Sequence, residues 1–533
     1  MLEQPTTSSA LPTEGSQAAE SSRAATEHDA LHLRRSLSLN LVGYAIKLVQ
    51  PFLLIAVIRL YGPGAYGVFT LVQAILTVLM RLTLLGLDKG LLWWIPRQSP
   101  ADERLGLRAV VAWTMLSSSL IALATALVLA PTLAAWAERP DITESLRWMV
   151  TGLIAMVLME VFSQAAAGKR NLEAHVLFKN GLVTVMMPAA AIVFYFAGMS
   201  GTGLALSFFV AQALGLAGVL WSFRRVFRGS QWSGPRWALP PALWRYSWPM
   251  WLSELLLAMF QRLDVFVLAA LTDEVAVGIF VGAATYAANI TSIRVSFDPM
   301  VFAMVASIHH ANDRTRLRRS FAHAWLMVAT LQIPLTALML AGAAWIMPLL
   351  GPKYAAGVEP AIVLIALYSV HGLFGGNQHI VSGFGRSGLT VINMLAALAI
   401  GTLLLSLLIP PYGVTGAAWG IGLTYVALNA IWAAEARIIT GGWHYERSIA
   451  EMLALTGVAG GAAGLTWIWL APWLTFDGFD GVARVAALAV FAAIFTPGML
   501  ALRRRAKATA ALGDPLRPIA SAAPKDDDKG ARR

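Results

Sequence analysis

The stretch from Gly388 to Ala436 reads GLTVINMLAALAIGTLLLSLLI, then PPYGV, then TGAAWGIGLTYVALNAIWAAEA, which is two apolar runs separated by a short turn. Each run is 22 residues long, and a helix that crosses a bilayer core of about 30 Å needs roughly 20 residues. The prolines and glycine of Pro410–Gly413 favour a turn between the runs. The stretch therefore predicts a transmembrane helical hairpin.

Runs of the same kind occupy almost the whole chain. Of its 533 residues, 57% are hydrophobic and 13% are charged, against roughly 25% charged residues in a soluble domain. Fourteen such runs lie at about 36–59, 66–87, 107–130, 148–167, 176–197, 203–222, 246–271, 276–298, 322–349, 359–382, 388–409, 415–436, 449–471 and 483–502. We predict an all-α polytopic membrane protein of about fourteen transmembrane helices.

The charges in the links between these runs alternate. Arginine and lysine occupy every second link, whereas acidic residues such as Asp141, Asp273 and Asp477 lie in the other links. By the positive-inside rule the basic links face the cytoplasm, so both termini are predicted to be cytoplasmic and the protein to lie in the inner (plasma) membrane. The same rule accounts for the net charge of +11, and we predict no nucleic-acid partner.

An internal repeat appears when the chain is aligned with itself at an offset of about 211 residues. Three pairs of segments match at this offset, give or take two residues: Ala65–Phe69 with Ala276–Phe280, Asp88 with Asp298, and Thr202-Gly203 with Thr415-Gly416. The predicted helices fall into step as well, so the chain contains two parallel repeats of six helices. Parallel repeats are a transporter architecture, in which the substrate path lies between the two halves.

The repeat predicts six parts of the chain. They are a disordered cytoplasmic tail (1–35), an N-terminal lobe (36–222), a cytoplasmic link (223–245), a C-terminal lobe (246–440), two accessory helices (441–502) and a basic cytoplasmic tail (503–533). The first tail is rich in Ser, Ala, Thr and Glu, which disfavours a packed core. Because the chain has no cysteine, disulfides and thiolate sites are excluded. We predict neither a metal site nor a cofactor.

Short motifs near the predicted helix ends carry a resemblance to a known family. The motifs are Tyr61-Gly62-Pro63, Tyr66-Gly67-Val68-Phe69, Gly86-Leu87-Asp88, Ile95-Pro96-Arg97, Ser247-Trp248-Pro249, Asp264, Val277-Gly278-Ile279, Leu350-Gly351-Pro352-Lys353-Tyr354, Gly383-Phe384-Gly385-Arg386 and Ile409 to Ala418. In this order and spacing, over roughly 36–436, they resemble the polysaccharide-export (O-antigen, or lipid-linked oligosaccharide) flippases. That family belongs to the multidrug/oligosaccharidyl-lipid/polysaccharide superfamily.

The resemblance carries expectations about fold and activity. It implies two six-helix bundles that form a V around a central cavity. It also implies that the protein translocates an undecaprenyl-pyrophosphate-linked oligosaccharide for surface or exported polysaccharide synthesis. The expected partners are this lipid-linked oligosaccharide and membrane lipids, with a polysaccharide polymerase and glycosyltransferases as further candidates.

Four cations lie inside the apolar runs, namely Lys47, Arg81, Arg262 and Arg294. A charge that faces lipid at this depth costs at least about 2.5–3.5 kcal/mol, so we expect these side chains to face a cavity or one another. A pyrophosphate needs cationic partners while it crosses the membrane, which makes the four cations candidate substrate-binding residues. The alternative is that each is neutralised by a nearby carboxylate.

Acidic residues and histidines also lie at membrane depth. The candidate sites for a coupling proton or sodium ion are Glu160, Glu254, Asp264, His371 and His379. The two histidines are eight residues apart and hence near one helical face, where they could line a proton path. The alternatives are packing histidines and structural ion pairs, with Asp264 or Glu254 as the partner of Arg262.

Two pairs of glycines have the GxxxG spacing that is typical of closely packed membrane helices. These pairs are Gly416 with Gly420 and Gly460 with Gly464. The spacing predicts that a neighbouring helix approaches the backbone at both places. It predicts packing and carries no chemistry.

Sequence motifs of enzymes are absent from the chain. It has no phosphate-binding GxxxxGK[ST] loop, no nucleophile elbow and no zincin motif, and the links predicted to face outward are short. We therefore predict a transporter and not an enzyme. Two alternatives to polysaccharide export are a lipid II flippase and a cation-coupled multidrug antiporter, although four cations against three carboxylates at depth favour an anionic substrate.

Overall fold

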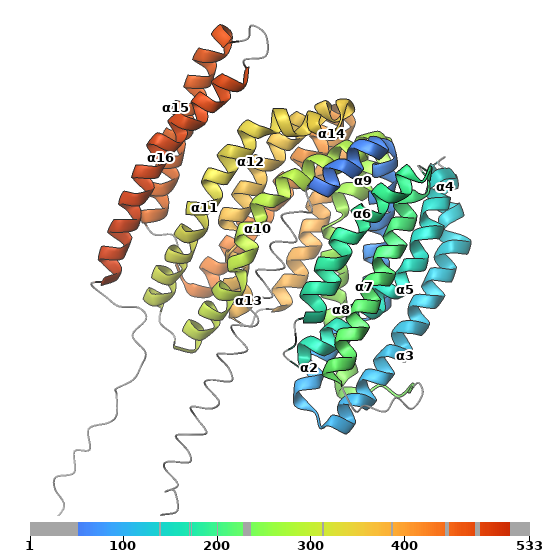
Figure 1. The fold of residues 1–533 in the computed structure, drawn as a ribbon. Helices are drawn as coiled ribbons and strands as arrows, with labels where there is room; N and C mark the ends of the chain where they lie inside the picture. The colour runs from blue at the N-terminus through green and yellow to red at the C-terminus, as the bar shows by residue number, and fades with distance from the viewer. Residues whose placement is uncertain are drawn as a thin grey trace, which may run out of the picture. The chain divides into compact units, whose positions relative to one another are not determined.

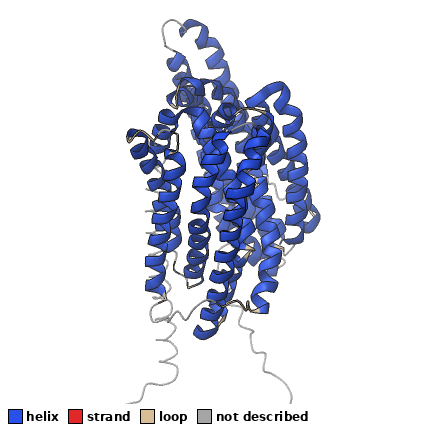
Figure 2. Cartoon of the chain, turned by 90° about the vertical axis from the view of Figure 1, so that its right-hand side faces the viewer, coloured by secondary structure: helices blue, strands red, loops and turns tan. Residues whose placement is uncertain are grey.

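The structure is a computed structural model that describes residues 52–137, 140–169, 171, 173–199, 201–227, 236–311, 314–384, 387–442, 447–474 and 480–511. Within these ranges the chain is helical and contains no strand (Figure 2). Lys47, most of the first apolar run, the whole of the predicted N-terminal tail and the predicted C-terminal tail after Ala511 lie outside the described residues.

The helices confirm the predicted all-α polytopic fold. Eleven segments are long and apolar enough to cross a membrane. One of them, Gly388–Thr440, contains two of the predicted runs, which are divided at Gly413, where φ is 54° and ψ is −128°. The seventh run corresponds to two shorter helices, α8 (Pro241–Phe260) and α9 (Leu263–Leu271). These two additions account for thirteen of the fourteen predicted runs, and the first run lies mostly outside the described residues.

Contacts divide the chain into two compact units. Of the described residues, the first unit comprises those up to Tyr61 together with Val68–Leu255, and the second comprises Gly62–Gly67 together with those from Leu256 to Ala511. The division falls within α8, because the first half of α8 packs on the N-terminal helices. The domain boundaries and the V-shaped arrangement expected from the resemblance stay predictions.

The first unit is a bundle built around one buried helix. Its elements are the helix Phe52–Leu84 without its segment Gly62–Gly67, α2 (Leu87–Trp94), α3 (Pro100–Ala124), α4 (Ala130–Ala137), α5 (Pro140–Gly168), the π-helical segment Ala174–Leu182, α6 (Val183–Phe196) and α7 (Gly203–Val226). Of the most apolar part of α5, 78% of the residues are buried. The neighbours of α5 include α2, α3, α4 and α7 (Figure 1), so a polar side chain on α5 is removed from lipid.

The second unit contains the second set of helices and an accessory pair. Its elements are α9, α10 (Glu274–Ala311), α11 (Arg314–Leu349), α12 (Val358–Phe374), α13 (Asn377–Gly383), α14 (Ser387–Thr440), α15 (Arg447–Leu474) and α16 (Asp480–Ala511). Figure 1 shows α15 and α16 side by side as a hairpin. Their buried residues Met452, Phe491 and Phe495 pack with Trp325 of α11, which anchors the pair to the rest of the unit.

A sharp break separates the helix Phe52–Leu84 from α2. Leu85 and Gly86 both have a positive φ, of 50° and 70°, and Leu85 is the only described residue other than glycine in that region. A left-handed backbone costs a residue with a side chain roughly 1–2 kcal/mol, so the surrounding packing must hold the break in place. At the repeat-related position of the second unit, α10 continues without interruption to Ala311.

Two glycines with a positive φ allow backbone strain and steric overlap to be separated. Gly62 has a φ of 77°, and no atom of the described residues lies within 4 Å of a Cβ built on it, whereas a Cβ on Gly86 would overlap the carbonyl oxygen of Ser247 on α8. We expect Gly62→Ala to cost about 1–2 kcal/mol through strain alone. Gly86→Ala should cost roughly 1–3 kcal/mol more, because the overlap is with backbone.

Thermal unfolding of the purified variants measures this difference. The two substitutions are chemically identical and impose similar backbone strain, so each serves as the control for the other. Equal melting temperatures for Gly62→Ala and Gly86→Ala would contradict the close packing of α8 on the helix break.

Within the second unit, a contact between backbones reflects the internal repeat. A Cβ on Gly67 would overlap the carbonyl oxygen of Glu274, and a Cβ on Gly278 would overlap the carbonyl oxygen of Pro63. Both Gly67 with Gly278 and Pro63 with Glu274 are 211 residues apart (278 − 67 and 274 − 63). The contact is therefore reciprocal at the offset of the internal repeat.

The two GxxxG pairs differ in their surroundings. A Cβ on Gly416 would overlap the carbonyl oxygen of Leu408, and one on Gly420 would lie 2.8 Å from the side chain of Leu405, so the predicted close contact is confirmed there. The prediction is wrong for Gly460 and Gly464, since no atom of the described residues lies within 4 Å of a Cβ built on either. Both border an open groove, which spacing alone does not distinguish from a helix contact.

Candidate functional site

A cluster of charged side chains lies at the helix break of the first unit. Nη1 of Arg81 is 3.3 Å from Oδ2 of Asp88 and 3.4 Å from Oε2 of Glu254, and Nζ of Lys89 is 3.8 Å from Oε1 of Glu254. On a straight helix, two residues seven apart are separated by about 10 Å along the axis. The break at Leu85 therefore brings Asp88 back within hydrogen-bond reach of Arg81.

A second ion pair of the first unit joins α5 to the π-helical segment. Nζ of Lys179 contacts Oε2 of Glu160, whose side chain is 3% exposed. Nε2 of Gln164 donates a hydrogen bond of 3.0 Å to Oε1 of Glu160. π-Helical turns are rare and occur often at functional sites, and this one carries both Lys179 and His175.

The charges of these two clusters balance. Their cations Arg81, Lys89 and Lys179 face the carboxylates Asp88, Glu160 and Glu254. A guanidinium binds carboxylate and phosphate in the same planar geometry, so an anionic substrate can replace a carboxylate on Arg81 without exposing the cation to lipid. The arrangement suits reversible binding of an anion, because the empty site is already neutral.

The second unit repeats the arginine–aspartate pair. Nη1 of Arg294 donates hydrogen bonds of 3.2 Å to both carboxylate oxygens of Asp298, and Nε2 of His379 lies 2.8 Å from Oδ1 of Asp298. Nε of Arg294 is buried with no hydrogen-bond partner among the described residues. Asp88 and Asp298 are the aspartates matched by the repeat, so each repeat holds an arginine beside its matched aspartate.

The two candidate histidines have different partners. Nδ1 of His371 lies 3.3 Å from Oδ1 of Asn429, and its ring packs 4.4 Å from the ring of Tyr425. His379 instead contacts Asp298. His371 and Glu160 are 211 residues apart (371 − 160) and both are buried, at 7% and 2% exposure. The repeat thus places one titratable side chain in the middle of α5 and one in α12.

Two further candidates lie where α9 begins. Arg262 immediately precedes Leu263, the first residue of α9, and so marks the interruption between α8 and α9. Asp264 is 9% exposed, and its Oδ1 accepts a hydrogen bond of 2.8 Å from the amide of Val265. Asp264 therefore has a local partner at the start of the helix. The roles predicted for Arg262 and Asp264 stay predictions.

Sequence reasoning missed several charged residues of these clusters. Lys179 lies inside the fifth apolar run, and inspection of every run for single charges would have found it. Asp88 and Asp298 served only as markers of the repeat, although each follows a candidate arginine by less than two helical turns. Lys89, adjacent to Asp88, gave no signal of its own. Which carboxylate faces which cation depended on packing.

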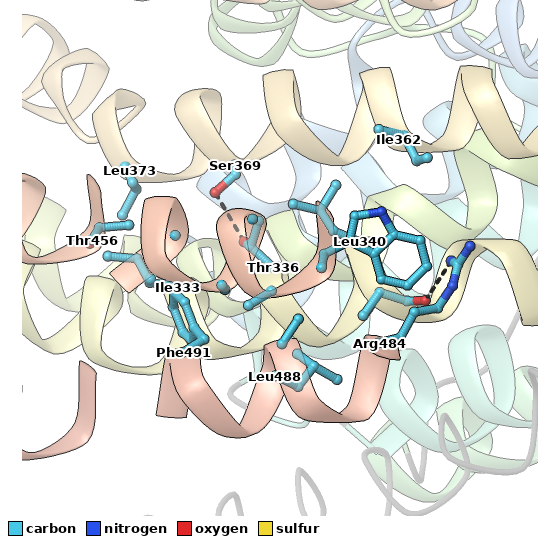
Figure 3. A pocket seen from close by; sticks show the side chains of 17 residues that line it. Ile333, Thr336, Leu340, Ile362, Ser369, Leu373, Thr456, Arg484, Leu488 and Phe491 are labelled. Carbon is cyan, nitrogen blue, oxygen red and sulfur yellow. Dashed lines mark hydrogen bonds between the residues drawn. The ribbon is translucent and has the colours of Figure 1, made fainter. Parts of the chain in front are cut away.

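An apolar groove runs between the accessory pair and the C-terminal bundle of the second unit. It has a volume of about 520 Å³ and is lined by α11, α12, α15 and α16 (Figure 3). Arg484 is the one charged residue among those that line it. Its Nη1 donates a hydrogen bond of 3.2 Å to the carbonyl oxygen of Ala341, and its guanidinium lies 4.7 Å from the ring centre of Trp467. The groove has room for an apolar chain.

Helix order and packing define the class of fold. The lipid II flippase MurJ in an inward closed conformation has a TM-score of 0.68 at 10% identity, covering 87% of this chain and 99% of that chain. An inward-facing multidrug resistance MATE family transporter of the MOP superfamily gives 0.57 at 13% identity, with coverage of 74% and 94%. The Vibrio cholerae MATE transporter VcmN, in a mutant form, gives 0.54 at 17%, with coverage of 78% and 98%. The chain has the fold of MOP-superfamily transporters.

The family itself follows from the sequence. Residues 56–359, more than half of the chain, match the family model described as polysaccharide biosynthesis protein. The chain therefore belongs to this polysaccharide biosynthesis protein family, which confirms the family resemblance. No curated protein sequence matches the chain.

Proposed function

We propose that the protein flips an undecaprenyl-pyrophosphate-linked oligosaccharide across the inner membrane by alternating access, as a step in the synthesis of surface or exported polysaccharide. One observation carries the proposal: Arg81 and Arg294, on repeat-related helices, are each held in a half-buried pair with an aspartate. Membership of the polysaccharide biosynthesis protein family and the MOP-superfamily fold support it.

The paired arginines meet two opposing requirements of a flippase. The site must bind a multiply charged pyrophosphate strongly enough to replace its hydration, and it must also release it. Because Asp88 and Asp298 compete with the phosphate for the same guanidinium groups, each arginine supplies a moderate contact. Lys47, which lies outside the described residues, and Arg262 are further cations of the proposed site.

The apolar groove of the second unit supports a lipid-linked substrate. A prenyl chain must stay in an apolar environment while its polar head crosses the membrane. The groove offers such an environment between α11, α12, α15 and α16. MurJ, which shares the fold, is named a lipid II flippase, so a peptidoglycan precursor is the nearest alternative substrate.

The proposal includes an orientation and a set of partners. Both termini face the cytoplasm, as the basic links indicate, and the substrate enters from that side. Glycosyltransferases supply the lipid-linked oligosaccharide, and a polymerase consumes it after translocation. The protein itself acts as a transporter and not as an enzyme. A proton or a sodium ion is the candidate coupling ion, and no cofactor is required.

Complementation of a flippase-null strain tests the proposed anion site. We expect Arg81→Ala and Arg294→Ala each to lower glycan export by roughly 10-fold to 100-fold, the loss of one or two charge-assisted hydrogen bonds. Arg81→Lys and Lys47→Arg keep the charge and should retain substantial export, whereas Lys47→Ala should lose most of it. Arg104→Ala is the matched control, because Arg104 lies outside both clusters on α3, where its Nε donates a hydrogen bond of 2.8 Å to the carbonyl oxygen of Pro100.

Membrane abundance of each variant must be measured beside export. Normal export by well-expressed Arg81→Ala and Arg294→Ala proteins would overturn the cationic site. In that case Glu160, Glu254 and Asp264 would become the better candidates, as in a cation-coupled multidrug antiporter. Export of cationic drugs by the unaltered protein would lead to the same conclusion.

A further inference from the structure

We propose that Asp88 is the proton-binding site of the first unit, and that it takes up a proton when Arg81 passes from Asp88 to a pyrophosphate. The inference rests on the proposed function, because it names the group that couples anion binding to a proton. No bond other than the O–H of the carboxyl forms or breaks, and the proton comes from and returns to water.

The burial of Asp88 and Arg81 is unequal. The side chain of Asp88 is 1% exposed, whereas those of Arg81 and Glu254 are 21% and 20% exposed. Arg81 is therefore the accessible member of its pair, and an incoming anion meets Arg81 before Asp88. When Arg81 turns to the anion, Asp88 is left buried without its closest cation. A buried carboxylate without a cation becomes protonated instead of remaining charged.

The surroundings of Asp88 favour this protonation. The charged groups that act on it are Arg81 on the preceding helix, Lys89 on α2, Glu254 on α8 and Glu160 on α5. Lys179 and His175 on the π-helical segment lie on the far side of this set, where Lys179 pairs with Glu160 and His175 interacts with Lys179, Glu160 and Lys89. Burial, followed by the charge of Glu160, raises the pKa of Asp88 to about 6 even though Arg81 and Lys89 oppose the shift. Asp88 lies between the membrane-spanning segments Phe52–Leu84 and Pro100–Ala135.

The packing that imposes backbone strain at Leu85 also fixes the position of Asp88. Leu85 has a φ of 50°, and Gly86 is wedged against Ser247 on α8. Strain of this kind persists only where the surrounding packing imposes it, and it often marks a functional site. The matched aspartate of the second unit, Asp298, lies on an unbroken helix with a side chain that is 20% exposed. The buried, strained position is therefore particular to the first unit.

The charge balance determines the direction of coupling. With Asp88 ionised, the three cations and three carboxylates of the two clusters cancel, whereas a proton on Asp88 leaves these six residues with one net positive charge. Protonation therefore favours anion binding, and by reciprocity anion binding favours proton uptake. Below the pKa of Asp88 the carboxyl is already protonated and affinity is highest. Above it, affinity should fall by up to about tenfold per pH unit.

Calorimetric titration of the purified full chain with farnesyl pyrophosphate tests the proposal. Repeating the titration in buffers of different ionisation enthalpy gives the number of protons taken up on binding. We expect the unaltered protein to take up more protons on binding than the pyrophosphate of the probe accounts for, and we expect Asp88→Asn to lack this excess. Asp88→Asn should also bind the probe at about pH 8 as tightly as the unaltered protein binds it at about pH 5.5. His175→Gln, which removes a neighbouring titratable group, should retain the uptake.

A spectroscopic measurement detects the proton directly. The infrared carbonyl band of a protonated carboxylic acid should titrate in the unaltered protein and be absent from Asp88→Asn. If Asp88→Asn does not fold, Asp88→Glu keeps a carboxyl and should shift the midpoint of this titration. Unchanged proton uptake and an unchanged band in Asp88→Asn would overturn the role of Asp88 alone. Failure of the unaltered protein to bind the probe at any pH would overturn the proposed function as well.

Discussion

Gly278→Leu should prevent the second unit from folding. A Cβ at this position already overlaps the carbonyl oxygen of Pro63, and Gly67 has the reciprocal relation to Glu274. Backbone atoms of two packed helices cannot move aside as a flexible side chain can, so the helices must separate. Overpacking of an ordinary core costs about 1–3 kcal/mol, and we expect a larger loss here. Gly67→Leu should have the same effect.

Gly461→Leu is the matched control for both variants. Gly461 lies on α15, and no described atom is within 4 Å of a Cβ built there. Leucine favours a helix over glycine by roughly 0.5–1 kcal/mol, so this variant should be as stable as the unaltered protein or slightly more stable. Monodispersity and the melting temperature after extraction from the membrane measure the outcome. A folded Gly278→Leu protein with normal stability would disprove the close contact.

Lys179→Met should cost about 3–5 kcal/mol of stability, because it leaves a buried carboxylate without its cation. Glu160 is 3% exposed and cannot reach water, whereas Lys179 is 22% exposed. Glu160→Gln should therefore cost less than Lys179→Met, since the lysine left behind can be partly hydrated. The double variant Glu160→Gln/Lys179→Met removes both charges and should recover most of the stability.

A double-mutant cycle with two readouts separates structure from transport at this pair. Melting temperatures give the coupling free energy between Glu160 and Lys179, and complementation gives export by the same proteins. If the pair is only structural, the double variant regains both stability and export. Recovery of stability without export would assign Glu160 a coupling role. If the double variant lost as much stability as the two single variants together, the ion pair itself would be contradicted.

Much of the fold follows from the sequence because lipid imposes a local rule. A helix that spans the bilayer needs about 20 apolar residues in succession, so each span is visible in its own stretch of chain. The exceptions have local causes. Gly413 divides two predicted helices without ending their hydrogen-bonded run, and residues 261–262 interrupt the seventh. The turn residues Pro410–Gly413 indicate the first interruption, although not its geometry, whereas Gln261 and Arg262 carry no turn signal.

The candidate site was predicted only in part. The sequence identified Arg81, Arg294, Glu160 and Glu254 as charges at membrane depth, because a charge in an apolar run is conspicuous. It offered Glu254 as a partner of Arg262, whereas the structure places Glu254 beside Arg81 and Lys89. It did not identify Asp88 as a partner of Arg81. A seven-residue separation suggests no contact on a straight helix, and the break at Leu85 has no signal beyond Gly86.

The sequence by itself thus determined the helix count, the internal repeat, the family and the kinds of charge held at depth, all of which depend on composition along the chain. Only the tertiary structure decided which charges pair. Glu254 contacts Arg81 although the two residues are 173 positions apart in the sequence (254 − 81), and Lys179 contacts Glu160 from another helix. The physical reason is that a buried charge is stabilised by the nearest opposite charge in space, and proximity in space is set by packing and helix breaks.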